Sequence, residues 1–246
     1  MIKSWSITDV GLVRSENQDF YAVQEDPISH RTICVVCDGM GGADGGQLAS
    51  HIAVETFLEE LKQVLKPDMG PEQLREASSY AASLANKEIR KAAQATEEFR
   101  NMGTTLVSAV SYEGGMVILN AGDSRAYHIT EGGITRITKD HSLVESMVDR
   151  GDITAEEARR HPSRNLITRA LGPDESVLCD GYICPLEAGD YLLLCTDGLV
   201  NTVSDQEMLF EVIHGGDPDS CLDRLLNIAK ENGAPDNVTA VLMQKQ

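Results

Sequence analysis

The sequence predicts an α+β fold, and three observations support this prediction. Residues 43–66 and 71–100 have the pattern of two long consecutive helices. From Gly103 onward the chain changes to short apolar strands separated by tight glycine turns. A last apolar strand, residues 238–243, follows two short helices. The 246 residues contain no linker or low-complexity tract, so we expect one domain covering residues 1–246.

Three strands are expected before the first helix. Residues 6–8 and 20–24 are short candidates, and residues 32–37 form a nearly all-apolar strand. That strand ends at Asp38, and a glycine-rich turn, residues 39–42, comes next. This part of the chain predicts strands that lead into a helix through a tight turn.

The two long helices are predicted from periodicity and from their ends. Apolar residues recur at three-to-five-residue steps along one face of the first helix: Leu48, Ile52, Phe57, Leu61 and Leu65. Pro67 and Gly70 end this helix. The second helix begins at Pro71, because proline suits the first helical turn.

Glycine-containing turns separate the next four predicted strands. These strands cover residues 104–112, 116–121, 125–130 and 134–138. Short strands joined in this way are typical of an antiparallel meander.

The segment at residues 139–172 is polar and broken, with short helical pieces at 143–150 and 155–160. A segment of this kind between sheets is typical of a flap. The remaining elements are a buried strand and two short helices, at residues 191–195, 205–214 and 219–231.

Composition excludes several classes of function. With 39 acidic and 21 basic residues the formal charge is −18, which repels nucleic acids and anionic lipids but accepts cations and basic segments. The longest apolar stretches, such as residues 33–37 and 191–195, are far shorter than the ~20 residues of a membrane helix. Residues 1–10 contain no signal-peptide pattern. We expect a cytoplasmic protein with no nucleic-acid or membrane partner.

The six cysteines sit mostly inside apolar runs, so we expect free thiols in a reducing compartment. Cys34 and Cys37 lie three residues apart on one predicted strand and should point to opposite faces. This argues against a metal or redox role for the pair.

Four aspartates lie directly beside apolar strands. They are Asp38, Asp123, Asp197 and Asp236. Glycine adjoins three of them and allows close approach of backbone or ligand. Each aspartate taken alone also fits an ordinary turn, but ordinary turns would use Asn and Ser as freely. If the strand ends converge, the carboxylates form a cage suited to Mg²⁺ or Mn²⁺, with Asp19 as a candidate fifth member.

A site of this kind suits phosphate hydrolysis. Two metals about 3.5–4 Å apart prime a bridging water for in-line attack on phosphorus. Arg14 lies five residues before Asp19 and could hold two phosphate oxygens, although a lone arginine also fits a surface charge. His141 and His161, in the broken segment, are alternative general acids, or simply polar surface residues.

Other phosphate-handling designs are excluded. No lysine follows a glycine, so a Walker A loop is absent, and Asp44 stands where a dinucleotide-binding fingerprint needs its last glycine. No cysteine has an arginine six positions later, which excludes a cysteine-nucleophile phosphatase loop.

Several short motifs occur in order along nearly the whole chain. They are residues 11–14 with 17–19, 36–42, 102–105, 121–125, 140–144, 161–162 with 165–172, 196–199 and 236–239. In this order and spacing the chain resembles the type 2C metal-dependent serine/threonine protein phosphatases (the PPM family), in particular the short bacterial members that consist of the catalytic domain alone.

The resemblance implies a four-layer αββα sandwich, in which helices flank two antiparallel β-sheets and metals occupy a cleft at one end. It also implies a flap subdomain at about residues 140–172. The cofactors implied are Mn²⁺ or Mg²⁺, two ions in the core site and a third near the flap.

The resemblance also implies ligand roles. Asp38 would bridge two ions, with the Gly39 carbonyl on one and Asp197 and Asp236 on the other. Asp19 would support the second ion directly or through water.

Further roles follow from the same resemblance. The third ion would involve Asp123 and Asp197, and Arg14 matches the phosphate-holding arginine. Animal relatives carry a histidine where this chain has Met40, so a metal-bound water or His161 has to donate the proton.

The function implied is metal-dependent hydrolysis of phosphoserine and phosphothreonine on proteins by a metal-activated water, reversing kinase signalling. The partners implied are phosphoproteins, including a cognate Ser/Thr kinase, and the chain is expected to be a monomer. Two alternatives are a hydrolase of small phosphate esters and a catalytically dead binding module. The second alternative is weakened because all five aspartates are present.

Overall fold

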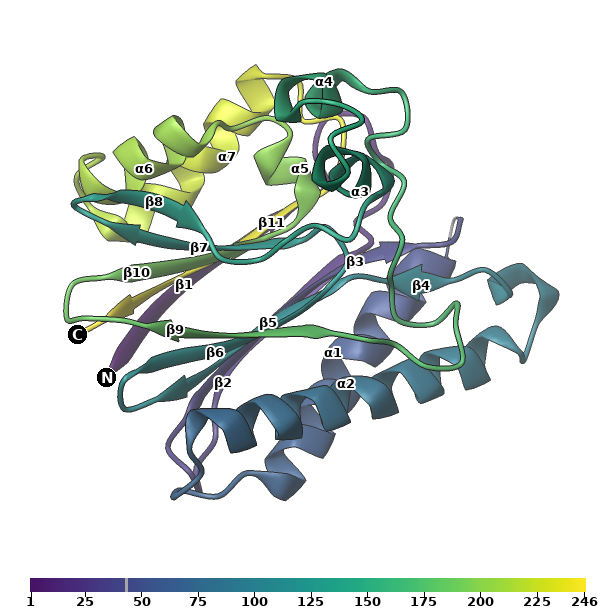
Figure 1. Ribbon diagram of the computed structural model, residues 1–246, viewed down its shortest axis with the longest axis horizontal. Helices are drawn as coiled ribbons and strands as arrows, with labels where there is room; N and C mark the ends of the chain where they lie inside the picture. The colour runs from purple at the N-terminus through teal and green to yellow at the C-terminus, as the bar shows by residue number, and fades with distance from the viewer. Residues whose placement is uncertain (43) are drawn as a thin grey trace.

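The computed structural model describes residues 1–42 and 44–246, and its strands form two antiparallel sheets (Figure 1). The first sheet has the order β1 (Ile2–Asp9), β11 (Val238–Lys245), β10 (Tyr191–Cys195), β7 (Arg125–Thr130), β8 (Gly133–Arg136). The second has the order β2 (Asp19–Glu25), β3 (Thr32–Met40), β5 (Leu106–Tyr112), β6 (Gly115–Ala121), β9 (Asp180–Pro185), and β4 (Gly103–Thr104) pairs with β3.

Helices cover the outer faces of both sheets (Figure 1). The second sheet is covered by α1 (Gly45–Val64) and α2 (Pro71–Ala93), and the first by α6 (Asp205–Ile213) and α7 (Cys221–Glu231). The short elements are α3 (Leu143–Asp149), α4 (Ala155–Arg160), α5 (Asp197–Val200) and the 3₁₀ helices η1 (Glu97–Phe99) and η2 (Pro218–Ser220). This order of layers confirms the predicted αββα sandwich.

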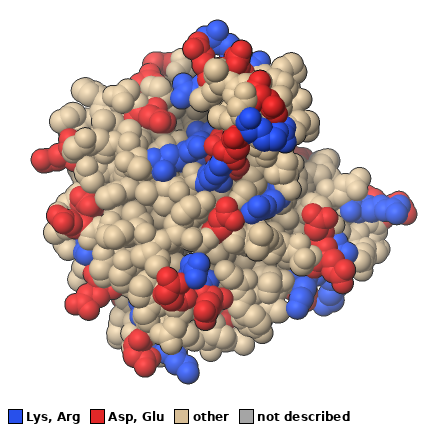
Figure 2. Space-filling model, in the orientation of Figure 1, with Lys and Arg blue, Asp and Glu red and all other residues tan. Residues whose placement is uncertain are grey.

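Charged side chains of both signs are interspersed on the face shown in Figure 2, and they gather at its top, over α3 and α4. In the described part of the chain, no helix combines the length and the apolarity needed to span a bilayer.

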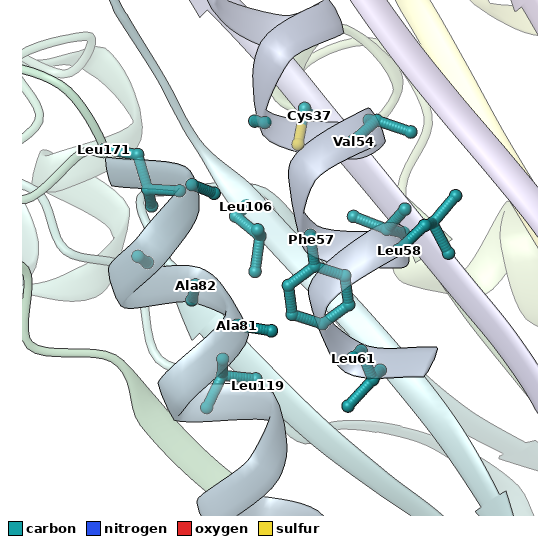
Figure 3. Packing of buried hydrophobic residues seen from close by; sticks show 14 of the residues in the cluster. Cys37, Val54, Phe57, Leu58, Leu61, Ala81, Ala82, Leu106, Leu119 and Leu171 are labelled. Carbon is teal, nitrogen blue, oxygen red and sulfur yellow. The ribbon is translucent and has the colours of Figure 1, made fainter. Parts of the chain in front are cut away.

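Apolar side chains fill three layers. Between the two sheets, alternate residues of β3, β5, β6, β10 and β11 interdigitate, among them Val36, Val107, Ile118, Leu194 and Val241. Beneath α1 and α2, Phe57 of α1 points toward Ala81 and Ala82 of α2 (Figure 3). The small alanines let the two helices approach closely. The third layer lies beneath α6 and α7.

The cysteines follow the same layering. All six are free. Cys34 lies in the layer between the sheets and Cys37 in the layer under α1 and α2, so the two thiols point to opposite faces as predicted.

The predicted meander is wrong in its pairing. β5 pairs with β6 in one sheet, whereas β7 pairs with β8 in the other. The chain crosses between the sheets at Gly122, whose φ of +116° is readily adopted only by glycine. A glycine turn therefore marks a crossing between sheets here, not a hairpin.

Other element boundaries also differ from the prediction. The second long helix ends at Ala93, not near Arg100, and η1 follows it. The predicted strand at residues 104–112 is interrupted at Thr105, and β3 extends past Asp38 to Met40. The predicted start of the first helix at Ala43 lies outside the described residues, and the helix is observed from Gly45. Neither β9 nor α5 was predicted.

Candidate metal centre

A pocket of about 460 Å³ opens at one end of the sandwich, where strand ends from both sheets meet. Its lining includes Arg14, Glu16, Gln18, Asp38, Gly39, Met40, Thr105, Asp123, Asn165, Ile167, Asp197, Asp236 and Asn237. Four of the five predicted ligand aspartates therefore share one cavity, although they lie far apart in the sequence, from Asp38 to Asp236. Asn165 and Ile167, from the segment for which a flap is predicted, form part of its wall.

Asp19 lies behind this cavity. It is directly opposite Asp38 across the β2–β3 pair and is only 5% exposed. Its Oδ2 accepts a hydrogen bond of 2.9 Å from Thr196 Oγ1, whereas its Oδ1 is buried with no hydrogen-bond partner among the described residues.

Asp38 lies near the end of β3, where the backbone is closely packed. Its backbone N–H donates to Thr105 Oγ1 at 3.0 Å. A Cβ at the following residue, Gly39, would lie 2.0 Å from the carbonyl oxygen of Gly46. Only glycine therefore fits at residue 39. Its close contact with the first turn of α1 fixes the end of β3 that carries Asp38.

Asp197 and Asp236 come from neighbouring strands of the other sheet. Asp197 begins α5 and is separated from the end of β10 only by Thr196, and Asn201 Nδ2 donates to its Oδ2 at 3.1 Å. Its Oδ1 is buried and has no hydrogen-bond partner among the described residues. Asp236 precedes β11, and its Oδ2 accepts from Arg14 Nη2 at 2.8 Å. The sheet pairing of β10 with β11 brings the two carboxylates together.

Burial, together with mutual repulsion, raises the pKa values of Asp19, Asp38, Asp123 and Asp197. Burial, followed by the charges of Asp19, Asp197, Asp123 and Asp236, raises the pKa of Asp38 well above its usual value. Burial is also the main cause for Asp19 and Asp123, whose pKa values rise to about 7, and for Asp197, whose pKa rises to about 6. The site therefore holds more negative charge than its own side chains neutralise.

The uncompensated charge fits divalent cations. Buried carboxylate oxygens without a partner, on Asp19 and Asp197, are the atoms that a cation would satisfy. Among the described residues, however, no three His, Cys, Asp or Glu side chains are placed to hold one ion by themselves. This geometry suits ions bound by one or two carboxylates, a backbone carbonyl and water, which is the usual coordination of Mg²⁺.

Two polar residues organise the site, although no role was predicted for them. Thr105 Oγ1 accepts from the Asp38 N–H of β3 and is also 2.7 Å from Ser124 Oγ. Thr105 therefore connects β3 to the turn containing Asp123. Asn237 is buried; its Nδ2 donates to the carbonyl oxygens of Val10 and Glu16, and its Oδ1 accepts from the Gln18 N–H. Asn237 therefore holds the loop that carries Arg14. The sequence signal for them was their place in the motifs at residues 102–105 and 236–239.

Neither candidate general acid lines the pocket. His161 ends α4, and its Nδ1 accepts from the Ser163 N–H at 3.1 Å. His141 is buried, with both ring nitrogens in contact with polar groups. The structure brings together Arg14, Asp38, Gly39, Asp123, Asp197 and Asp236, with Asp19 behind them.

Comparison with known proteins agrees with this architecture. A family model described as protein phosphatase 2C matches residues 13–243. The serine/threonine phosphatase stp of Listeria monocytogenes is 34% identical over 238 residues, covering 97% of this chain and 94% of that protein. The crystal structure of the serine/threonine phosphatase Stp1 from Staphylococcus aureus is similar, with a TM-score of 0.91, 36% identity, and coverage of 100% and 96%.

A further similar structure contains metal. It is the catalytic domain of the serine/threonine protein phosphatase PstP in complex with two manganese ions, with a TM-score of 0.82, 31% identity, and coverage of 99% and 97%.

Fold and site together define the class as serine/threonine protein phosphatases. Within that class, the chain belongs to the protein phosphatase 2C family.

Proposed function

We propose that this protein hydrolyses phosphoserine and phosphothreonine on proteins, with divalent metal ions held by the carboxylates of the pocket. The main support is the convergence of Asp38, Asp123, Asp197 and Asp236 on one cavity, with unsatisfied carboxylate oxygens. Bound Mn²⁺ or Mg²⁺ would supply charge neutralisation and activation of a water for attack on phosphorus.

The chain's own residues have distinct tasks in this proposal. Asp38 and the Gly39 carbonyl would face one ion, Asp38, Asp197 and Asp236 a second, and Asp19 would support the second from behind. Asp123 with Asp197 would hold a third. This assignment is supported by the shared cavity, by the register of Asp19 with Asp38 and by the pairing of β10 with β11.

Arg14 would bind the phosphate. Its guanidinium is half exposed at the pocket and paired with Asp236 at 2.8 Å. This ion pair fixes the orientation of the planar guanidinium, and its remaining N–H groups are available for phosphate oxygens. The flap, residues 140–172, would border the bound protein segment, since Asn165 and Ile167 line the pocket.

The substrates in the cell would be phosphoproteins, including a Ser/Thr kinase whose signalling this enzyme reverses. The acidic surface supports basic rather than acidic partner segments.

The test compares chelated protein with protein supplied with Mn²⁺, on a phosphothreonine peptide and on small phosphate metabolites. Turnover of the peptide that depends on added metal supports the proposal. Turnover confined to the small metabolites would favour the small-ester hydrolase, and absence of metal-dependent turnover on all substrates would favour a binding module.

A further inference from the structure

His141 is buried at the neck of the flap, with 7% of its surface exposed. The flap leaves the sandwich at this residue and returns at Thr168, whose N–H donates to the His141 carbonyl at 2.7 Å. An isolated bridge between Ser142 and Ile167 closes the neck one residue further out. Both strands of the neck therefore meet at His141.

One side of the imidazole ring contacts the turn that carries Asp123. The Gly122 N–H donates to the ring nitrogen His141 Nδ1 at 3.1 Å, and the backbone N–H of His141 donates to the Gly122 carbonyl at 2.9 Å. The turn has little freedom to accommodate a change, because a Cβ on Gly122 would lie 2.6 Å from Thr105. The ring thus supports the backbone immediately before a proposed metal ligand.

The other side of the ring faces Asp180 and Arg169. Since a backbone N–H can only donate, Nδ1 must be the acceptor, and the proton of the neutral ring is on Nε2. Nε2 therefore donates to Asp180 Oδ2 at 3.0 Å, and Asp180 Oδ1 accepts from Arg169 Nη1, also at 3.0 Å. The 3.2 Å contact of Arg169 Nη1 with Nε2 is then a contact between two donors, not a hydrogen bond.

We propose that His141 is a positioning residue, whose Nδ1 side holds the Asp123 turn and whose Nε2 side holds the returning strand of the flap through Asp180 and Arg169. This inference rests on the proposed function, in which Asp123 binds metal and the flap borders the substrate. One ring then fixes the metal-binding turn and the flap relative to each other. The neck has a separate anchor, because Arg125 forks onto Asp140 with contacts of 2.9 and 2.7 Å.

Two substitutions separate the two sides of the ring. In His141→Asn the side-chain oxygen replaces Nδ1 as acceptor for the Gly122 N–H, but the shorter side chain no longer reaches Asp180, which keeps only its bond from Arg169. In His141→Gln the terminal amide reaches the position of Nε2 and donates to Asp180, but the acceptor for Gly122 is lost. Asp180→Ala is a third variant. It removes the carboxylate that links His141 Nε2 to Arg169 and leaves the imidazole ring in place.

Two readouts that need no turnover test the proposal: the rate of tryptic cleavage within the flap, and the Mn²⁺ concentration at the midpoint of the metal-induced thermal shift. For His141→Asn and Asp180→Ala we expect cleavage about tenfold faster, since a charge-assisted hydrogen bond holding the flap is lost, with an unchanged Mn²⁺ midpoint. For His141→Gln we expect the reverse: unchanged cleavage and a Mn²⁺ midpoint about tenfold higher, as for loss of other outer-shell partners.

The proposal is overturned if His141→Asn and His141→Gln change the cleavage rate and the Mn²⁺ midpoint in the same way. It is also overturned if neither variant changes either readout. Should a His141 variant fail to fold, Asp180→Ala decides, and cleavage at the wild-type rate overturns the flap half. KM and kcat on the peptide and on p-nitrophenyl phosphate give a further separation, because a loosened flap should raise KM for the peptide alone. Absence of metal-dependent turnover in the wild type would defeat the proposed function but would leave the cleavage comparison valid.

Discussion

Asp38 is surrounded by more carboxylates than a protein interior tolerates without compensation. Four other aspartates raise its pKa in addition to burial. We predict that Asp38→Asn lowers kcat on a phosphothreonine peptide by a factor on the order of 10² or more, because metal ions contribute several kcal/mol of charge stabilisation to phosphoryl transfer. The measurement is steady-state kinetics at saturating Mn²⁺.

The matched control is Asp223→Asn, the same change at an exposed position on α7. It should leave kcat unchanged. Equal activity in both variants would remove Asp38 from the site.

Arg14 allows a test of geometry as well as of charge. Arg14→Lys keeps the positive charge but loses the planar fork that can contact Asp236 and a phosphate at once. We expect kcat/KM on the peptide to fall about tenfold in Arg14→Lys and further in Arg14→Ala. A lysine variant with wild-type kcat/KM would show that only charge matters at this position.

At the scale of elements, α1 and α2 pack together against the outer face of the second sheet. Phe57 is fully buried in this layer, next to Ala81 and Ala82 (Figure 3). We predict that Phe57→Ala lowers the free energy of unfolding by about 3–5 kcal/mol, through lost burial and a residual cavity. Chemical denaturation of both proteins measures the difference.

Phe210→Ala is the comparison for this change. Phe210 is on α6 and 57% exposed, so its removal should alter the free energy of unfolding by no more than about 0.5 kcal/mol. Similar losses in the two variants would contradict the assigned burial.

Local sequence signals identified most elements but not all of their partners. β7, β10 and α4 have the predicted boundaries, because apolar runs and capping residues are local properties. The pairing of β6 and β7 in different sheets was not predictable, since a glycine turn permits either a hairpin or a crossing. Strand β9 was missed because its sequence, DGYICP, contains aspartate, glycine and proline, which are rare in strands.

For the candidate site too, local sequence signals identified residues but not their spatial partners. Aspartates beside strands predicted the carboxylate cluster, because a residue at a strand end lies outside the apolar core and an adjoining glycine lets a ligand approach. The sequence could not show that Asp19 would lie behind Asp38, since this depends on the β2–β3 register. Nor could it place His141 against Gly122, because that contact depends on tertiary packing between two separate segments of the chain.

At the scale of the whole molecule, the acidic cluster opposes folding in the absence of metal. The pKa values of Asp19 and Asp123 are raised to about 7 and that of Asp197 to about 6, from an ordinary value of 3.8. Between about pH 4 and 7 the folded state therefore binds more protons than the unfolded state. These groups therefore lower the stability of the chelated protein as pH rises through this window.

We predict that the Tm of chelated protein decreases between pH 5 and 7.5, and that saturating Mn²⁺ raises Tm most at the upper end, because cations and protons compete for the same oxygens. Asp197→Asn removes one repelling charge, so its metal-free form should be more stable than the wild type at pH 7.5 and should gain less from Mn²⁺. Thermal denaturation of both proteins over this pH range, with chelator and with Mn²⁺, measures each effect. The difference between wild type and variant cancels the contribution of other titrating groups. If metal-free Asp197→Asn were less stable than the wild type at pH 7.5, the carboxylates would not be repelling one another, and the argument for a cation-binding cluster would fail.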